Sequence, residues 1–505
     1  MWRPLTFLLW AIVTVCQAAP GKGRHGDWDK GLVVYTSSGE AHGKIDSAYP
    51  HVRQFLGIPF AQPPVGSLRW MPPQPLPPSA ARTKIEATNL PPSCIQYLGT
   101  GPSLYLDDVL EFNLEGLNRT GIISEDCLTL SVWAPTGNDC GPGLPVLLYI
   151  YGGGFETGGQ NVPYQLPSQW VERSRDHIVV SFNYRLNIFG FPNAAGLDDK
   201  NVGLLDQRLA VEWVSANIAR FGGDPSRITL WGQSAGGASV DLYNYAWSDD
   251  PIVSSLIMDS GNTFLLSSND FTQSNFSFVA SSLGCGGVNA TAELACMRGL
   301  NASTIENFLS VYQQNGSLPA ISFAPIADEK VVFSNYTLRA SQGHISKIPA
   351  IMGTNAQDGV PFAPYNAAGV NQTLAQAAYL ALFFCTTTEA IELRQLAGVP
   401  TYTYLYSGNF SNISPRPWMG AYHSSELPLI FGTYGNYRGP STALEVDTSK
   451  AMQDAWLTFA ADGPEGLNGI GWEEYVLGAS SVRDFGNGVA VKTTSLAATE
   501  ALCAA

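Results

Sequence analysis

Short apolar runs and helical repeats alternate along the middle of the chain. Residues 145–151 and 177–181 are continuous apolar runs of strand length, which is typical of strands buried on both faces of a parallel sheet. From 203 to 219 the apolar side chains recur near helical spacing, and glycines at 222–223 mark the end of that helix. A further apolar run follows at 228–231. This order predicts a parallel sheet that helices cover on both faces.

The flanking segments extend the same pattern. Residues 32–59 alternate short β-type runs with Gly and Ser turns, as expected of an antiparallel edge of a larger sheet. Two long stretches, 262–349 and 360–399, are predicted to form helical insertions above the sheet, where they can wall a pocket. Further strands are predicted at 255–258, 348–352 and 401–406. The fold class is therefore α/β, with a mostly parallel central sheet.

Residues 1–18 have the composition of a secretion signal. Arg3 gives a positive start, an apolar run extends from Leu5 to Val15, and small residues lead to the cleavage that we expect after Ala18. Neither this run nor any later stretch free of charge, Pro and Gly reaches the ~20 residues of a spanning helix, so we expect no stable membrane anchor. Nine Asn-x-Ser/Thr sequons fit a secreted, extracellular glycoprotein; they begin at Asn118, Asn275, Asn289, Asn301, Asn315, Asn335, Asn371, Asn409 and Asn412.

Charge and cysteine content narrow the classes of function. A formal net charge of −15 and a pI near 4.8 disfavour nucleic acid and anionic membranes as partners. One of the eight cysteines lies in the signal, and an oxidising compartment favours disulfides for the others. No C-x-x-C or H-E-x-x-H pattern occurs, so we expect neither a metal site nor a cofactor. We expect residues 19–505 to form one domain, because the candidate catalytic elements are spread from Gly152 to His423.

Gly232-Gln233-Ser234-Ala235-Gly236 is a G-x-S-x-G motif between a predicted strand and a predicted helix. A strand-to-helix turn of this kind is too sharp for bulky neighbours, so glycines flank a serine whose hydroxyl is pushed up at the carboxyl edge of the sheet. An ordinary Gly/Ser turn is the alternative interpretation. The strand before and the helix after favour a nucleophile elbow, with Ser234 as the nucleophile.

A serine hydroxyl needs an imidazole to take its proton and a carboxylate to hold that imidazole. In this architecture the three occur in the chain order Ser, acid, His. Only His344 and His423 follow Ser234, and only His423 also follows a plausible acid loop. Asp358 and Asp259 each come after a predicted strand. Strand position favours Asp358 as the acid and leaves Asp259 as its rival.

Gly152-Gly153-Gly154-Phe155 lies directly after a predicted buried strand. Acyl transfer needs backbone N–H donors aimed at the negative charge of a tetrahedral intermediate. This fold uses a glycine-rich loop at this place, together with the N–H of the residue after the nucleophile, here Ala235. A flexible glycine turn is the alternative interpretation of the loop.

These residues resemble the type-B carboxylesterase family, which includes cholinesterases, fungal extracellular esterases and lipases. Two segments resemble family signatures along their full lengths, namely 221–236 and 125–135. Three shorter segments add to the match, at 151–155, 183–185 and 201–208. The similarity covers almost the whole chain after the signal. It implies an α/β-hydrolase fold and a serine carboxyl-ester hydrolase that acts through an acyl-enzyme on uncharged esters.

Carried over residue by residue, the resemblance implies Ser234 as nucleophile, Asp358 as acid and His423 as base, and it favours Asp358 over Asp259. The implied oxyanion donors are the N–H groups of Gly153, Gly154 and Ala235. The family usually has Glu at the acid position, so the shorter Asp358 requires its loop to approach His423 more closely. Glu426, three residues after His423, resembles a buried family glutamate near the site.

Disulfides and one ion pair are implied by the same resemblance. The positions of two family disulfides are occupied by Cys94 with Cys127 and by Cys285 with Cys296. Cys385 resembles the first half of a third family bridge, for which Cys503 is a candidate partner, and Cys140 is unassigned. Arg69 and Glu125 occupy the positions of a structural ion pair.

Sequence differences from the cholinesterase branch bear on the ester substrate. That branch has a Glu before the nucleophile and a Trp in the first disulfide loop; these places hold Gln233 and Leu117 here. A quaternary ammonium needs an aromatic cage and gains from negative charge, so choline esters are disfavoured. Residues 408–418 resemble the fungal secreted esterases of the family.

Two other functions compete with a general esterase. A lipase for longer-chain acylglycerols or sterol esters is one, because the first disulfide loop carries apolar side chains that either form a lid or simply pack on the body. These are Tyr97, Leu98, Leu104, Tyr105, Leu106, Val109, Leu110 and Phe112. A non-catalytic adhesion protein is the other, since the family includes members that have lost the triad. The presence of nucleophile, acid, base and glycine loop together disfavours it.

Overall fold

The computed structural model describes residues 31–97, 99, 101–109, 123–137, 143–265, 268, 270–436, 438–479 and 481–503. Several residues named above therefore lie outside the described residues. They are the signal segment, Leu98, Leu110, Phe112, Leu117, Asn118 and Cys140.

An eleven-stranded sheet forms the centre of the fold, with the strand order β16-β15-β14-β13-β12-β11-β9-β10-β8-β4-β3. Its strands are β3 (Lys44–Ile45), β4 (Val52–Pro59), β8 (Thr129–Pro135), β9 (Leu144–Ile150), β10 (Ile178–Phe182), β11 (Gly223–Gln233), β12 (Ser255–Asp259), β13 (Ala350–Asn355), β14 (Thr401–Tyr406), β15 (Val482–Phe485) and β16 (Val491–Thr494). The strands from β10 to β15 pair in parallel, and the strands at both edges pair antiparallel. The predicted mostly parallel sheet with an antiparallel edge is confirmed.

Two smaller sheets flank the central one. One joins β1 (Val33–Thr36), β2 (Gly39–His42) and β5 (Lys84–Glu86), and the other joins β6 (Ser93–Cys94) and β7 (Ile123–Ser124). Short 3-10 turns occupy Gly66–Leu68, Pro78–Arg82, Pro163–Gln165, Ile218–Phe221, Val360–Phe362 and Tyr434–Asn436.

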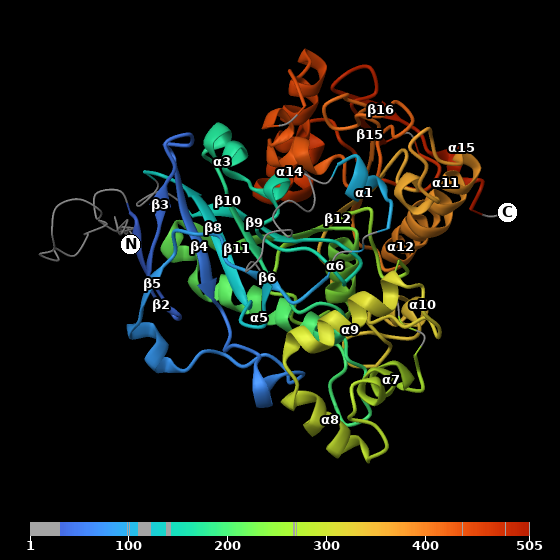
Figure 1. Ribbon diagram of the computed structural model, residues 1–505. Coiled ribbons are helices and arrows are strands. Elements are labelled where there is room, and N and C mark those ends of the chain that lie inside the picture. Colours follow the sequence, from blue (N-terminus) through green and yellow to red (C-terminus); the bar gives the residue numbers. More distant parts are fainter. Residues whose placement is uncertain are drawn as a thin grey trace, which may run out of the picture.

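Helices cover both faces of the sheet, as the alternation of strands and helices predicts. Figure 1 shows α3 (Ser168–Ser174) and α14 (Ala443–Gly469) on one side, and α5 (Val202–Asn217) and α6 (Ala235–Ala246) on the other. Three interior strands, β10, β12 and β13, are buried at every residue, and β9 is buried after its first residue, because both of their faces lie beneath helices. The remaining α-helices are α1 (Leu104–Asp107), α4 (Asn187–Gly190), α13 (Leu427–Phe431) and α15 (Ala497–Glu500), together with those of the insertions.

The two predicted insertions are helical. The first contains α7 (Ser274–Ser282), α8 (Ala290–Gly299), α9 (Ala302–Gln314) and α10 (Tyr336–Ser341). The second contains α11 (Gln372–Ala378), the π-helical turn η8 (Tyr379–Phe384) and α12 (Cys385–Leu396). Helices α7 to α9 enclose a second hydrophobic cluster that includes Trp70, Phe276 and Met297, separate from the core of the central sheet.

One helical segment of the described chain, Gln372–Leu396, is long and apolar enough to cross a membrane by length and composition. It is made of α11, η8 and α12, and it packs against the body of the protein. Arg394 is buried within it and donates hydrogen bonds to Thr401 Oγ1 and to the Ile348 carbonyl. Cys385 in the same segment forms a disulfide with Cys503. These contacts account for the segment as a packed helix of the fold.

Candidate active site

Ser234 lies in the turn between β11 and α6. Its backbone has φ 58° and ψ −124°, a conformation that costs a non-glycine residue energy and that the surrounding structure must enforce. A Cβ atom at Gly232 would lie 2.2 Å from the Gly236 carbonyl oxygen, and one at Gly236 would lie 2.0 Å from that of Ile150. Both flanking positions therefore exclude any side chain, which is the sharp elbow that the motif predicts.

His423 and Asp358 meet through a hydrogen bond of 2.8 Å between Nδ1 and Oδ1. Both side chains are almost completely buried. The other carboxylate oxygen of Asp358 accepts hydrogen bonds from the Asn355 N–H at 2.7 Å and from Ser260 Oγ at 2.8 Å. With both oxygens engaged, the carboxylate has a defined orientation toward the imidazole. Asp358, despite being shorter than the family's usual Glu, reaches His423 directly.

Two phenylalanine rings lie close to the imidazole of His423, and a tyrosine contacts the backbone of the same residue. The ring centroid of Phe383 lies 4.5 Å from that of His423, and the Phe362 centroid lies 5.3 Å away. Tyr105 Oη donates a hydrogen bond of 2.9 Å to the His423 carbonyl. All three residues come from segments that sequence alone identified only as insertions or as a possible lid.

Nε2 of His423 lies 3.3 Å from Gln233 Nε2. Among the described residues no hydrogen bond joins Ser234 Oγ to His423, although both residues line one cavity. Catalytic hydrogen bonds are often loose in an enzyme without its substrate and tighten in the complex.

Asp259, the rival acid, makes a different set of contacts. Its carboxylate accepts hydrogen bonds from Trp231 Nε1 at 2.5 Å and from Tyr404 Oη at 2.9 Å. Burial raises the pKa of Asp259 to about 7, against the lowering effect of these two hydrogen bonds. The structure thus pairs His423 with Asp358 and leaves Asp259 without a contact to the imidazole.

Glu426 is fully buried at the start of α13 and its carboxyl accepts a hydrogen bond from Asn355 Nδ2. Burial, reinforced by the nearby carboxyls of Asp259 and Asp358, raises the pKa of Glu426 well above its ordinary value. Glu426 does not contact the imidazole; it touches Asn355, whose own N–H binds the Asp358 carboxylate. It belongs to the support of the acid loop.

Three backbone N–H groups near Ser234 have no hydrogen-bond acceptor within the part of the chain that the structure describes. They belong to Gly153, Gly154 and Ala235. Ala235 begins α6, so its N–H also carries the positive end of the helix dipole. Gly153 and Gly154 line the cavity that Ser234 also lines, and Ala235 directly follows Ser234 in the chain. Unpartnered donors beside a nucleophile can bind a developing oxyanion.

A cavity of about 650 Å³ lies above Ser234 and His423. Its apolar wall comes from both insertions and from α1; it is formed by Tyr105, Leu106, Val162, Tyr164, Leu265, Phe362, Leu382 and Phe383. Of the predicted lid residues, Tyr105 and Leu106 line this cavity, whereas Leu104 and Val109 pack into the core. Among its described lining residues there is no Asp, Glu or Trp.

The described residues contain no group of His, Cys, Asp and Glu side chains that could hold a metal ion.

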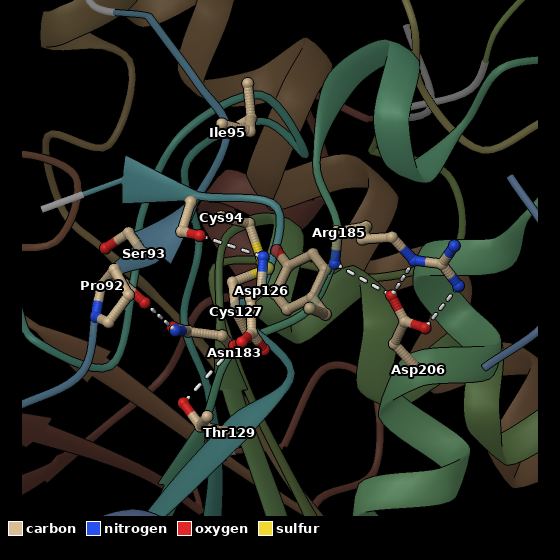
Figure 2. Close-up of a disulfide and its surroundings, with 12 residues drawn as sticks. Pro92, Ser93, Cys94, Ile95, Asp126, Cys127, Thr129, Asn183, Arg185 and Asp206 are labelled. Atoms are coloured by element: carbon tan, nitrogen blue, oxygen red, sulfur yellow. Dashed lines mark hydrogen bonds and ion pairs between the residues drawn. A yellow bond between two sulfur atoms is a disulfide. The ribbon is translucent and has the colours of Figure 1, made fainter. Parts of the chain in front are cut away.

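Disulfides and ion pairs brace the loops around the site. Both implied disulfides, Cys94–Cys127 and Cys285–Cys296, are present, and Cys385 pairs with Cys503. Figure 2 shows the first of these disulfides beside Asn183 and the Arg185–Asp206 pair. That pair is buried and bidentate, with distances of 2.8 and 2.7 Å. The implied ion pair of Arg69 and Glu125 is also bidentate, at 2.6 and 2.8 Å.

The structure separates the sequons by exposure. Asn289, Asn301, Asn315, Asn335, Asn371 and Asn409 are exposed, and Asn275 is partly buried. Asn412 is only 2% exposed, and its Nδ2 donates a hydrogen bond of 2.9 Å to the Tyr434 carbonyl. A glycan at Asn412 would have to be attached at that buried nitrogen, so this fold disfavours occupancy there, and glycosylation of the sequons stays a prediction.

Residues 30–381 and 366–499 match the model of the carboxylesterase family. The chain belongs to this family. A chlorogenic acid esterase from Aspergillus niger is 47% identical over 464 residues, which cover 91% of this chain and 88% of the relative. Secreted lipase 5 from Gibberella zeae is 43% identical over 92% of each chain. Lipase 2 from Diutina rugosa is 36% identical, covering 61% of this chain and 59% of its own.

Membership of the carboxylesterase family confirms the predicted α/β-hydrolase fold and the predicted class of enzyme. The protein is a carboxylic ester hydrolase. Its relatives include both esterases and lipases, and some of these carry the word secreted in their names. The family thus sets the reaction, while the roles of individual residues and the choice of ester depend on the geometry of the site.

Proposed function

We propose that this carboxylesterase is a secreted serine esterase in which Ser234, His423 and Asp358 form the catalytic triad. The observation that carries the proposal is the buried Asp358–His423 hydrogen bond together with an elbow serine that lines the same cavity as His423, Gly153 and Gly154, both of which have unpartnered N–H groups. A triad needs a nucleophile, an oriented base and oxyanion donors together. The sequons and residues 1–18 support secretion.

The proposed reaction follows from these positions. His423 accepts the Ser234 proton as Oγ attacks the ester carbonyl, and Asp358 holds the imidazole and stabilises its charged form. The N–H groups of Gly153, Gly154 and Ala235 bind the oxyanion, each worth on the order of 3–4 kcal/mol of barrier lowering. Collapse of the tetrahedral intermediate releases the alcohol, which takes the proton from His423. Water then attacks the acyl-enzyme by the same route and frees Ser234.

For the substrate, we propose an uncharged or phenolic ester of moderate size, of the kind represented by chlorogenic acid. The cavity volume lies within the ~300–1,000 Å³ of small-molecule sites. Four aromatic rings line the cavity and suit an aromatic acyl group; they belong to Tyr105, Tyr164, Phe362 and Phe383. The relative with 47% identity is a chlorogenic acid esterase. A choline ester finds no carboxylate among the described residues that line the cavity.

A lipase is the second candidate. The apolar wall that α1 and the second insertion build, and the 43% identity to a secreted lipase, favour it. Longer acyl chains would occupy more of the same cavity and would not need another site. The two candidates therefore share Ser234 and differ only in chain-length preference.

A hydrolysis panel distinguishes the candidates. We expect chlorogenic acid and short p-nitrophenyl esters to have higher kcat/KM than p-nitrophenyl palmitate, and a choline ester to be poorest. A maximum at palmitate, with emulsified triacylglycerol also cleaved, would select the lipase.

Ser234→Ala should abolish hydrolysis and organophosphate labelling with an unchanged circular dichroism spectrum. Ser239→Ala, five residues along α6 and also buried, is a matched control that should retain activity. Full activity of Ser234→Ala would refute the triad.

A further inference from the structure

The segment Asp259–Ser260 connects two members of the proposed triad. The Asp259 carbonyl accepts the N–H of Ser234 at 2.8 Å, in the register that pairs β11 with β12. Ser260, the next residue, donates from Oγ to Asp358 Oδ2 at 2.8 Å. One peptide therefore joins the loop of the nucleophile to the loop of the acid. Ser260 has φ 47°, so this peptide is held in a conformation that does not form by itself.

The side chain of Asp259 anchors that peptide to two strands of the sheet. Its carboxylate spans from Trp231 of β11 to Tyr404 of β14, through hydrogen bonds of 2.5 and 2.9 Å. Aromatic packing restrains both donors, because Trp231 stacks on Phe431 and the Tyr404 ring contacts Trp456 of α14. The anchor is thus a rigid part of the sheet, not a surface contact.

Asp259 also belongs to a buried group of ionisable side chains. Its charge interacts with titratable groups on β9, on β14 and in the loops after β13 and before α13, namely Tyr149, Tyr404, Asp358 and Glu426. Burial raises the pKa of Asp259 to about 7.

We propose that Asp259 is a positioning residue of the triad. Its side chain fixes the Asp259–Ser260 peptide between the N–H of Ser234 and the carboxylate of Asp358. This inference rests on the proposed triad, in which Asp358 is the acid.

The test compares Asp259→Asn, Asp259→Ala and the wild-type enzyme on one p-nitrophenyl ester between pH 4 and 9. Asparagine retains the shape and can still accept from Trp231, but it is never charged. Because the anchoring hydrogen bond from Trp231 remains, we expect Asp259→Asn to keep kcat and KM near those of the wild type. Asp259→Ala should lower kcat about 10- to 100-fold at similar KM, because the peptide between the triad loops loses its anchor.

Tyr404→Phe provides an independent variant should Asp259→Ala fail to fold. It removes one of the two hydrogen bonds that hold the Asp259 side chain, so we expect a smaller loss of kcat at similar KM. Full kcat in Asp259→Ala, or a loss of kcat in Asp259→Asn as large as in Asp259→Ala, would overturn the proposal. The loss of activity in Ser234→Ala tests the triad separately, so full kcat in Asp259→Ala would refute only the role of Asp259.

Discussion

Replacing Asp259 by asparagine should change how the free energy of unfolding depends on pH. Burial raises the pKa of this carboxyl from 3.8 to about 7 in the folded protein. The folded state then binds the proton more tightly than the unfolded chain, so stability is fully present below pH ~4 and is lost as pH rises to about 7. The shift of about 3 pH units, at ~1.4 kcal/mol per unit, corresponds to ~4 kcal/mol.

Asparagine has no proton to lose in this range. The unfolding free energy of Asp259→Asn minus that of the wild type should therefore increase by ~4 kcal/mol from pH 4 to pH 8, in favour of the variant. Urea unfolding followed by tryptophan fluorescence at intervals of one pH unit measures this difference. Asp249→Asn removes a charge from an exposed position, so its difference from the wild type should stay nearly constant across the same range.

Two results would contradict this reasoning. A difference that does not change with pH would mean that burial leaves Asp259 with an ordinary pKa. A wild type that gains stability relative to Asp259→Asn as pH rises would mean that the hydrogen bonds from Trp231 and Tyr404 outweigh burial.

Three further predictions concern the acid, a disulfide and a buried ion pair. Asp358→Asn should lower kcat on the order of 10⁴-fold with an unchanged circular dichroism spectrum, and near-wild-type turnover would refute its role as acid. Replacing Cys385 and Cys503 together by alanine opens a loop with a sequence separation of 118 residues and should cost ~4–5 kcal/mol in urea unfolding; no change in the midpoint would contradict this. Asp206→Asn leaves Arg185 buried without its charged partner and should cost about 3–5 kcal/mol, measured in the same way, whereas a neutral effect would show that the pair is dispensable.

Local sequence patterns were sufficient to predict those structural elements whose formation depends on a few neighbouring residues. The run at 401–406 predicts β14 to the residue, and the elbow glycines predict the turn at Ser234, because side-chain exclusion there is a property of a few neighbouring residues. By contrast, β15 and β16 were not predicted. They are short, and β16 is mostly exposed, so neither has the apolar run that identifies the interior strands.

The sequence by itself determined which residue types could perform the chemistry, and the order of Ser234 and His423 along the chain. Strand position favoured Asp358 but left Asp259 as a rival, because both lie at the carboxyl ends of parallel strands and so at the same edge of the sheet; the family resemblance then favoured Asp358. The tertiary structure decided which carboxyl meets the imidazole. It did so because side chains that alternate along a strand or leave it at a turn point in different directions, and only folding places Asp358 against His423 and Asp259 between Trp231 and Tyr404.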